Sequence, residues 1–591
     1  MAKCRRIRSK RVWLATLILG VISIALVSVP WRQANALASS SRDLAPMPEA
    51  QHVSLTGRLV DPTSEPVEGA TVILYINGSP VGSGEEGTEI EVESAVDGAF
   101  VLDLPQTDLG SVESLTLKIS RPHFSSLEWQ ATEQDLAKIN RSESLRLADM
   151  TIERRVTPAF WIAALTFVAI LTLVALDKLH TTMAALLGVA IILGVSSVGG
   201  TVDPDFFVFD FERAIEYVNF DVIFLVMGMM IVIGVIEETG IFQWLAYQAY
   251  RLSGGRAWLL VIILMLITAV ASALLDNVTT MLLMTPITIQ IALAMEVGPL
   301  SLLIPEVLAS NIGGISTLIG TPTNILIGAY AGLSFNDFLV HLTPGVLLAL
   351  VVLTGYILLR YRGQFLQRGG KLSETLLERL RESGRITQPD KLRMSGFIFA
   401  IMLVLFVLGE RIHLAPAVTA IIGAVAMLLW VTPDIESMLK VVDWTTLVFF
   451  ISLFIVVGAI QEVGVISMIA TTIGDLVGDN LTVAILVVVW SSALLSGVIA
   501  NIPFTAAMLP VIGYLSATIP GASNDVLYYS LSVGSAMGGN GTLIGASANL
   551  VTAGIADRAG YRITYASFFK IGFPAMILTV GAGCLWLLLR F

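Results

Sequence analysis

Residues 310–324 read SNIGGISTLIGTPTN, and residues 535–549 read SAMGGNGTLIGASAN. Both stretches place glycine and small polar residues inside otherwise apolar segments, and the first adds Pro322. Glycine and proline weaken an α-helix. A helix that is interrupted at membrane depth frees carbonyl groups for a cation and directs N–H groups at an anion. We therefore expect two interrupted helices that build a binding site.

The second stretch belongs to an internal repeat with an offset of between about 224 and 235 residues. Its other landmarks are Glu238 and Glu462, Asn277 and Asn501, Pro286 and Pro510, and Pro344 and Pro574. Glycine-rich membrane helices also occur where helices pack closely. Recurrence in register across both halves favours a binding site at the interface of two repeats instead.

The composition predicts a protein for which the membrane is the solvent. Of 591 residues, 55% are hydrophobic and 14% are charged, whereas about 25% are charged in a soluble domain. The apolar blocks are close to the roughly 20 residues that span a bilayer. We expect a multi-pass protein of the cell inner (plasma) membrane that contacts lipid and is not an enzyme. No basic patch indicates nucleic acid, and two cysteines support no disulfide framework or zinc site.

The polar segments Asp276–Thr280 and Ala500–Thr505 each lie between two apolar blocks. Polar groups at membrane depth persist only where they are buried in protein or line a cavity. We therefore predict that residues 257–295 and 481–518 are re-entrant hairpins with these segments as their tips. Five spans then remain in each half, and an odd number inverts the second half relative to the first.

The charges of the loops agree with this topology. Residues 360–393 hold nine Lys or Arg, which places them inside, whereas the acidic loop 200–217 falls outside. The predicted domains of this all-α part are a first repeat at 157–359, a cytoplasmic linker at 360–394 and an inverted second repeat at 395–591.

The N-terminal segment is predicted to begin in the cytoplasm. Basic residues precede the apolar run Val12–Val29, and Ala36–Ala38 resembles a signal-peptidase site. Residues 1–38 are therefore a retained signal anchor or a cleaved signal peptide. Both alternatives place residues 50–150 outside the cytoplasm.

Residues 50–150 have the pattern of strands and turns. Val53–Val60 alternates, and Asn77-Gly78 and Asp97-Gly98 are turn signals. The order of Gly57, Pro66 and Phe100 with these turns resembles the carboxypeptidase regulatory-like family, which implies a small all-β sandwich. Its expected role is structural or in partner contact, with ligand binding as the alternative.

The expected ion- and substrate-binding residues come from the hairpin tips and the interrupted helices. They are Asp276, Asn277, Thr279, Thr280, Asn501, Pro503 and Thr505 at the tips, and Ser310, Asn311, Gly314, Thr317, Gly320, Thr321, Pro322, Asn324, Gly539, Asn540, Thr542, Gly545, Ser547 and Asn549 in the interrupted helices. No metal-ligating cluster of another kind is predicted.

Two carboxylates are candidates for binding a proton or a cation. An intramembrane carboxylate is costly and indicates a function, so Asp276 could ligate sodium or exchange a proton. The alternative is a buried acid without a role in transport. Glu306 is the second candidate. The repeat partner of Asp276 is Ala500, so the two tips are not equivalent.

Lysine and arginine are missing from residues 257–359 and 471–557. An anion would have to bind there through hydroxyls, amides, helix N-termini and a co-bound cation. This favours a cation-coupled mechanism or a weakly charged substrate.

The segments Tyr250–Pro286, Asn501–Pro510 and Gly538–Asn549 resemble the ion transporter superfamily, most closely its melanosomal P proteins. The superfamily also includes arsenite permeases, D-type sodium/proton antiporters, citrate transporters and sodium/dicarboxylate symporters. The resemblance covers residues 158–591. It implies a homodimer that works as an elevator. It also implies Na⁺ or H⁺ as the coupling ion, without another cofactor. The Na⁺ sites are expected at the hairpin tips, one at Asn277 with Thr279 and the other at Asn501.

Three functions stay open at this point. The first is a secondary transporter that couples a small anion or carboxylate to Na⁺ or H⁺. The second is a sodium/proton antiporter with Asp276 as the exchange site. The third is an anion channel on the same fold.

Overall fold

The computed structural model describes residues 53–62, 66–80, 91–104, 112–141, 143–176, 178–367, 382, 385–431 and 434–591. The predicted signal anchor or signal peptide at 1–38 and the middle of the 360–394 linker lie outside the described residues. The internal contacts divide the chain into two units, with the division between Arg155 and Val156.

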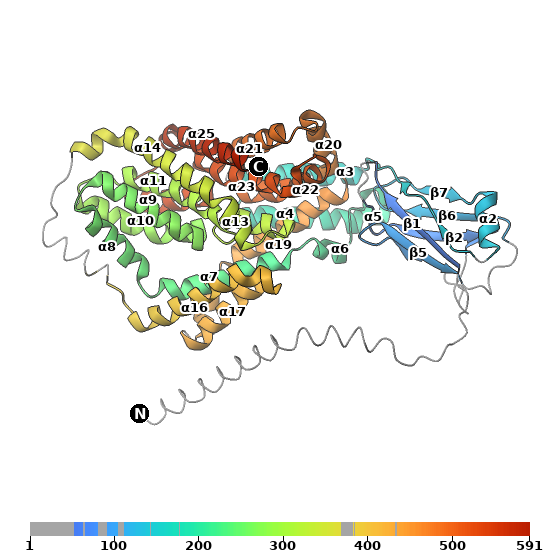
Figure 1. Cartoon of the computed structure of the whole chain (residues 1–591), viewed down its shortest axis with the longest axis horizontal. Helices are drawn as coiled ribbons and strands as arrows, with labels where there is room; N and C mark the ends of the chain where they lie inside the picture. The colour runs from blue at the N-terminus through green and yellow to red at the C-terminus, as the bar shows by residue number, and fades with distance from the viewer. Residues whose placement is uncertain are drawn as a thin grey trace, which may run out of the picture. The chain divides into compact units, whose positions relative to one another are not determined.

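The first unit contains two small β-sheets (Figure 1). One sheet consists of β1 (Val53–Val60), β5 (Ala99–Leu104), β8 (Leu145–Arg146) and β9 (Met150–Thr151). The other consists of β2 (Thr71–Ile76), β3 (Ser79–Pro80), β4 (Glu91–Glu93), β6 (Leu115–Ser120) and β7 (Leu127–Gln130), and α2 (Glu133–Ile139) follows β7. The antiparallel pair β1–β5 runs from Val53 opposite Leu104 to Arg58 opposite Ala99.

Alternate residues of both sheets are buried in one core. Leu55 and Leu102 of the first sheet share it with Val72 and Leu117 of the second. Alternation of apolar and polar residues is what a half-buried strand requires. The predicted β region before the membrane part is therefore confirmed.

The second unit is helical, and its main helices occur twice in the same order. The first set is α3 (Pro158–Ala175), α4 (Thr181–Gly194), α7 (Phe220–Glu237), α8 (Ile241–Ser253), α9 (Ala257–Leu274), α10 (Asn277–Ala294), α11 (Leu300–Gly313), α12 (Pro322–Ala331) and α14 (Thr343–Gln367). The second set is α16 (Pro389–Gly409), α17 (Pro416–Trp430), α19 (Trp444–Glu462), α20 (Val465–Val477), α21 (Leu481–Ser496), α22 (Asn501–Thr518), α23 (Val526–Gly538), α24 (Ser547–Arg558) and α25 (Tyr565–Arg590).

Short helices complete this unit. They are η2 (Val195–Gly199), α5 (Gly200–Val202), η3 (Pro204–Phe206), α6 (Phe211–Glu216), η4 (Gly314–Ser316), α13 (Phe335–His341), η5 (Glu410–Ile412), α18 (Ile435–Val441), η6 (Ala522–Asn524) and η7 (Gly539–Gly541).

Nine of the described helices are long and apolar enough to cross a membrane. Their surroundings differ: α3 and α4 bury 28% of their apolar windows inside the protein, whereas α7, α10 and α19 bury 61%. Large apolar side chains such as Trp161 and Leu165 of α3 are exposed, as expected where lipid is the neighbour. The helical unit is therefore a multi-pass membrane domain with α7, α10 and α19 in its interior.

Both glycine-rich stretches interrupt helices, as predicted. The chain passes from α11 through η4 to α12, and from α23 through η7 to α24. A Cβ at Gly314 would lie 2.6 Å from the Gly320 carbonyl oxygen, and one at Gly539 would lie 2.9 Å from the Gly545 carbonyl oxygen. Backbone packs against backbone at each interruption, so no larger residue fits.

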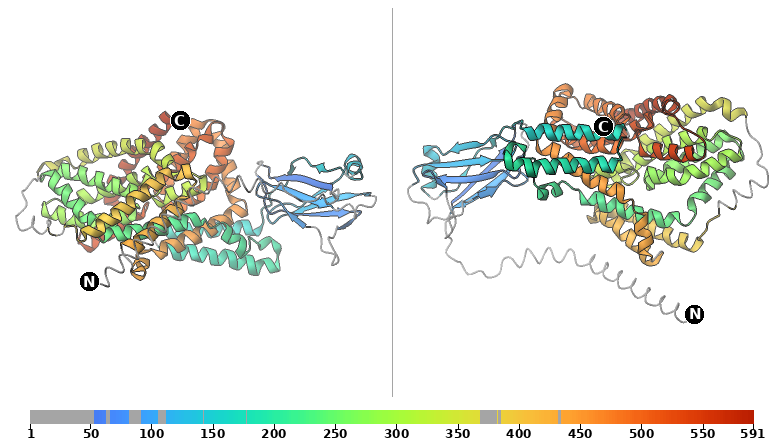
Figure 2. Two further views of the ribbon diagram at one scale, coloured as in Figure 1. Left: turned by 60° about the horizontal axis from the view of Figure 1, so that its bottom comes forward. Right: turned by 180° about the vertical axis from the view of Figure 1, so that it is seen from behind.

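The α9–α10 pair packs beside α11, and the α21–α22 pair packs beside α23. Figure 2 shows the helices of this unit from two further sides. These two helix pairs coincide with the predicted hairpins. Their re-entrant path, the inverted orientation of the halves and the domain bounds stay predictions.

Candidate functional site

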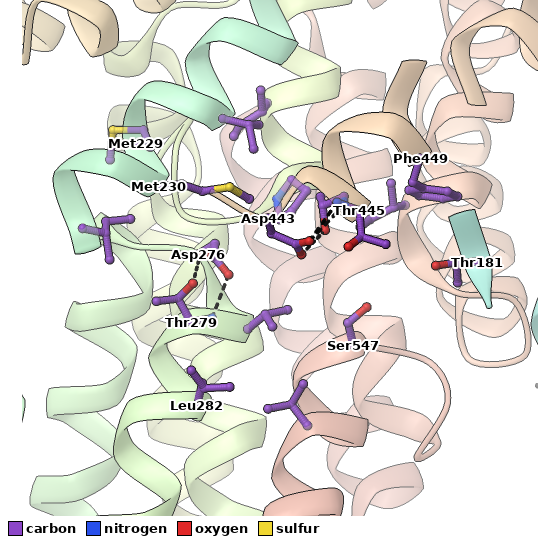
Figure 3. Close-up of a pocket in the computed structure, with 18 of the residues that line it drawn as sticks. Thr181, Met229, Met230, Asp276, Thr279, Leu282, Asp443, Thr445, Phe449 and Ser547 are labelled. Atoms are coloured by element: carbon purple, nitrogen blue, oxygen red, sulfur yellow. Dashed lines mark hydrogen bonds between the residues drawn. The ribbon is translucent and has the colours of Figure 1, made fainter. Parts of the chain in front are cut away.

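A cavity of about 580 Å³ lies inside the helical unit (Figure 3). The hairpin tips line it with Asp276, Val278 and Thr279 from the first half and Ala500, Ile502 and Pro503 from the second. Other lining residues are Pro322, Ser547, Met229, Met230, Glu237, His180, Thr181, Thr182, Asp443, Thr445 and Thr446. Residues that are more than 200 positions apart in the sequence therefore share one cavity.

Six of the described helices begin at this cavity: α4, α10, α12, α19, α22 and α24. The N-terminus of a helix carries unpaired N–H groups and a partial positive charge. The N-cap residues of α12, α22 and α24, which are Thr321, Ala500 and Ala546, make no side-chain capping hydrogen bond. Among the described residues that line the cavity, none is lysine or arginine. Backbone dipoles at these helix N-termini are therefore the groups of the described lining that could favour an anion.

Asp276 is the N-cap of α10, and its half-buried carboxylate faces the cavity. The backbone N–H of Thr279 donates to Oδ1 at 2.8 Å, and the Thr279 hydroxyl donates to Oδ2 at 2.5 Å (Figure 3). Each oxygen keeps a further lone pair for a ligand. Alanine at position 500 has no group that can cap α22, which is the structural basis of the predicted difference between the tips.

Asp443 is a second carboxylate on the cavity that the sequence analysis missed. It caps α19 through the backbone N–H groups of Thr445 and Thr446, at 3.1 and 3.2 Å, and through the Thr446 hydroxyl, at 2.6 Å. Burial raises the pKa of the Asp443 carboxyl group, but the hydrogen bonds from Thr446 and Thr445 outweigh burial and hold the pKa below its ordinary value. An aspartate followed by Trp-Thr-Thr is an N-cap signal, but nothing local indicates a cavity.

Four asparagine side chains form a buried hydrogen-bonded network between the halves. Asn277 Nδ2 donates to Asn311 Oδ1 at 2.8 Å. Asn311 Nδ2 donates to Asn540 Oδ1 at 2.8 Å and to Asn549 Oδ1 at 3.0 Å. None of the four is more than 5% exposed. The network joins the first hairpin tip to both interrupted helices.

Two more asparagine contacts fix the interruptions themselves. Asn324 Nδ2 donates to the carbonyl oxygens of Ile315 and Thr317, and Asn549 Nδ2 donates to those of Gly539 and Thr542. Because these donors bind carbonyls at the helix breaks, both amides have a local structural role.

The predicted site residues fall into three groups. Asp276, Thr279, Pro322, Pro503 and Ser547 line the cavity. A second group does not line the cavity and forms buried hydrogen bonds next to it: Asn277, Asn311, Asn324, Asn540, Asn549, Thr317 and Thr542. In this group, Thr317 donates to the Ala273 carbonyl oxygen and Thr542 donates to the Gly497 carbonyl oxygen. The rest are buried without lining the cavity: Thr280, Glu306, Ser310, Gly314, Gly320, Thr321, Asn501, Thr505, Gly539 and Gly545.

Comparison with known proteins gives consistent results. Residues 171–534 match the citrate transporter family. The chain is 37% identical over 432 residues to an uncharacterised transporter of Mycobacterium tuberculosis, which covers 73% of this chain and 98% of that protein. It is 34% identical over 562 residues to the P protein of Homo sapiens, covering 82% of this chain and 66% of that protein.

The fold is shared with solved structures, for example that of a bacterial transporter. The YdaH transporter of Alcanivorax borkumensis superposes with a TM-score of 0.51 over 69% of this chain and 98% of that chain, at 14% sequence identity. At this identity the likeness concerns the fold alone.

Proposed function

This chain belongs to the citrate transporter family and is a membrane transporter of small substrates, and we propose that it couples a small anion or carboxylate to Na⁺ or H⁺. The observation that carries the proposal is the cavity itself. Three uncapped helix N-termini and the carboxylates of Asp276 and Asp443 meet there, without a lysine or arginine among the described lining residues.

The two kinds of group suit two ligands of opposite charge. N–H groups at helix N-termini bind an anion. Carboxylate, amide and hydroxyl oxygens are the ligands that hard cations prefer. Asp276 and Thr279 supply such oxygens on the cavity wall, and Asn277 and Asn501 lie buried in the tips. A co-bound cation next to the anion would replace the missing basic side chain. This arrangement makes binding of each ligand depend on the other.

We further propose that the hairpins and interrupted helices move together as the transport domain of an elevator, within a homodimer of inverted repeats. The support for this movement is one hydrogen bond in each half between an interrupted helix and its hairpin. The hydroxyl of Thr317 donates to the Ala273 carbonyl oxygen near the end of α9, and that of Thr542 donates to the Gly497 carbonyl oxygen at the end of α21. Each interrupted helix is thereby attached to its own hairpin. In this arrangement the N-terminus lies in the cytoplasm and residues 50–150 lie outside the plasma membrane.

The second candidate function is sodium/proton antiport. Asp276, Asp443 and Glu237 all line the cavity, and carboxylates can bind Na⁺ and H⁺ in turn. An antiporter would use this acidic wall without an organic anion.

Flux through the purified full chain in proteoliposomes distinguishes the alternatives. Uptake of labelled citrate or succinate driven by a sodium or pH gradient supports the proposal. A pH-dye response to sodium without an organic anion identifies the antiporter. Currents of thousands of ions per second identify a channel and refute the carrier.

Two substitutions of Asp276 separate charge from helix capping. Asparagine caps a helix as well as aspartate does, whereas alanine costs about 1 kcal/mol. Asp276→Asn should abolish coupled flux and leave thermal stability unchanged, while Asp276→Ala should reduce both. The matched control is Asp434→Asn, because Asp434 caps α18 through Ser437 and does not line the cavity. Full coupled flux in Asp276→Asn would refute the role of this carboxylate.

A further inference from the structure

Three packed helices of the first half carry a group of buried hydroxyls, and two of these hydroxyls, on Thr268 and Thr288, lie beside Glu306. The group, which we term the hydroxyl seam, consists of Thr268 and Ser272 on α9, Thr280, Thr285 and Thr288 on α10, and Ser310 on α11. Every one of these side chains, and Glu306 on α11, is 0% exposed. Thr268 and Ser272 are four residues apart, as are Glu306 and Ser310, so each pair lies on one helix face.

Most polar atoms of the seam have no hydrogen-bond partner among the described residues. Thr268 Oγ1 donates to Glu306 Oε1 at 2.9 Å. Thr288 lies beside the same carboxyl group, although no hydrogen bond joins the two. The atoms without a partner are Glu306 Oε2, Ser272 Oγ, Thr280 Oγ1, Thr285 Oγ1, Thr288 Oγ1 and Ser310 Oγ.

Buried hydroxyls elsewhere in the protein differ: those of Thr419, Ser492, Thr505 and Ser516 also lack a partner among the described residues, whereas others are satisfied by their own helix. Thr552 and Thr579 each donate to the carbonyl oxygen four residues earlier, at 2.8 Å. A buried polar group left without a partner costs about 1–3 kcal/mol. Several such groups on three packed helices therefore point to a ligand that both donates and accepts hydrogen bonds, as water does.

Glu306 has no counter-charge among the described residues. Helices α9 and α10 contain no charged residue. The other main helices packed against α11 are α14, α23, α24 and α25; their titratable residues are Tyr356, Arg360, Tyr361, Arg362, Tyr528, Tyr529, Asp557, Arg558, Tyr565, Lys570, Cys584 and Arg590. Only Thr288 and Thr268 act on the carboxyl group through their side chains.

We propose that Glu306 binds the coupling proton and that the hydroxyl seam holds the water that carries this proton to and from the first hairpin tip. The inference rests on the proposed coupled transport and names its ion. An isolated carboxylate buried in an apolar interior is strongly unfavourable, which favours the protonated acid. A hydronium ion in the seam would transfer its proton to Oε2 and remain as water.

The seam residues on α10 are spaced from the level of Glu306 to the tip. Thr288 and Thr280 are eight residues apart on α10, which corresponds to about 12 Å along the helix. Thr280 directly follows Thr279, the residue that binds Asp276 at the cavity. Ser272 Oγ lies only 3.2 Å from where a Cβ on Gly314 would stand, so the seam ends against the interrupted helix.

A proton fits this position better than sodium does. Helices α9, α10 and α11 are continuous at the level of Glu306, so most of their carbonyls serve helical hydrogen bonds, and Pro286 and Pro305 free only those of Leu282 and Ser301. A hard cation needs several oxygen ligands at once, and only two hydroxyls lie beside the carboxyl group. The repeat partner of Glu306 is Leu531, so this acid belongs to the first half alone.

Infrared difference spectroscopy of the full chain across a pH series tests the proposal without a substrate. The carbonyl band of a protonated carboxylic acid should be present at neutral pH, lost in Glu306→Gln and retained in Asp276→Asn. Glu306→Leu, which copies the repeat partner, should lose it too. Absence of the band from the wild type, or its persistence in both Glu306 variants, would overturn the proposal. Loss of the band on adding sodium at constant pH would make Glu306 a sodium ligand and also overturn it.

The seam has its own test in Thr288→Val, which keeps the shape and removes the hydroxyl. The carbonyl band should shift because the acid loses a neighbouring hydrogen-bonding group. Thr552→Val is the matched control, since that hydroxyl binds its own helix, and should leave the band unchanged. Equal spectra for both variants and the wild type would exclude the seam as the partner of Glu306.

A transport measurement separates this proposal from the proposed function. With labelled citrate as probe, Glu306→Gln should lose uptake driven by a pH gradient and retain exchange without a gradient. If the wild type transports citrate with sodium alone, coupled transport stands and the proton at Glu306 is refuted. If the band behaves as expected but no gradient drives flux, the proposed function fails instead.

Discussion

Replacing Asn311 with alanine removes the centre of the asparagine network. Asn311 is 2% exposed and makes three side-chain hydrogen bonds of 2.8 to 3.0 Å, to Asn277, Asn540 and Asn549. At about 0.6 to 1.5 kcal/mol for each bond, the variant should lose roughly 2–4 kcal/mol of stability. The repeat partner of Asn311 is Ala536, so alanine is compatible with the surrounding helix.

Thermal and denaturant unfolding of the full chain in detergent measure this loss. The control is Asn336→Ala, which removes bonds to Val407 and Glu410 near the protein surface and should cost well under 1 kcal/mol. If Asn311→Ala lowers stability no more than the control does, the network does not hold the two halves together and the reasoning is wrong.

Two further predictions concern packing and pH. A Cβ at Gly313 would lie 2.3 Å from the Ala269 carbonyl oxygen, so Gly313→Ala should lower the free energy of unfolding by about 1–3 kcal/mol. The control Gly355→Ala, in open space on α14, should not lower the unfolding temperature. Equal unfolding temperatures for the two variants would contradict the packing argument. Because the pKa of Asp443 is held below its ordinary value, its cap is fully effective above about pH 4 and is lost as the pH falls through the lowered pKa. Asp443→Asn should therefore reduce the fall in unfolding stability at acid pH. Identical curves of stability against pH for the variant and the wild type would contradict this expectation.

Much of the fold follows from local signals. Alternation placed a strand at Val53–Val60, which is the range of β1. The apolar lengths and the polar tips located the helix pairs α9–α10 and α21–α22, because the length of a helix and its N-cap are properties of a few neighbouring residues. The glycine-rich stretches located both interruptions for the same reason.

The residues that line the cavity could be identified only from the tertiary structure. Thr279 lines it and Thr280 does not, since successive helical residues point about 100° apart. Met229 and Glu237 of α7 line it from a helix with no unusual local pattern. Only packing of the two halves brings Asp443 to the same place. Sequence patterns could therefore identify the interrupted elements but not the residues opposite them.

The single amide of Asn311 also links the two halves thermodynamically. Its N–H groups point to the second half and its oxygen to the first, so turning the amide for a ligand on one side breaks contacts on both. Occupancy at the first hairpin tip would then change affinity at the second interrupted helix, and the reverse effect would have the same factor. Ion titrations of such a protein would be cooperative, with a Hill coefficient above one, and Asn311→Ala would return that coefficient to one.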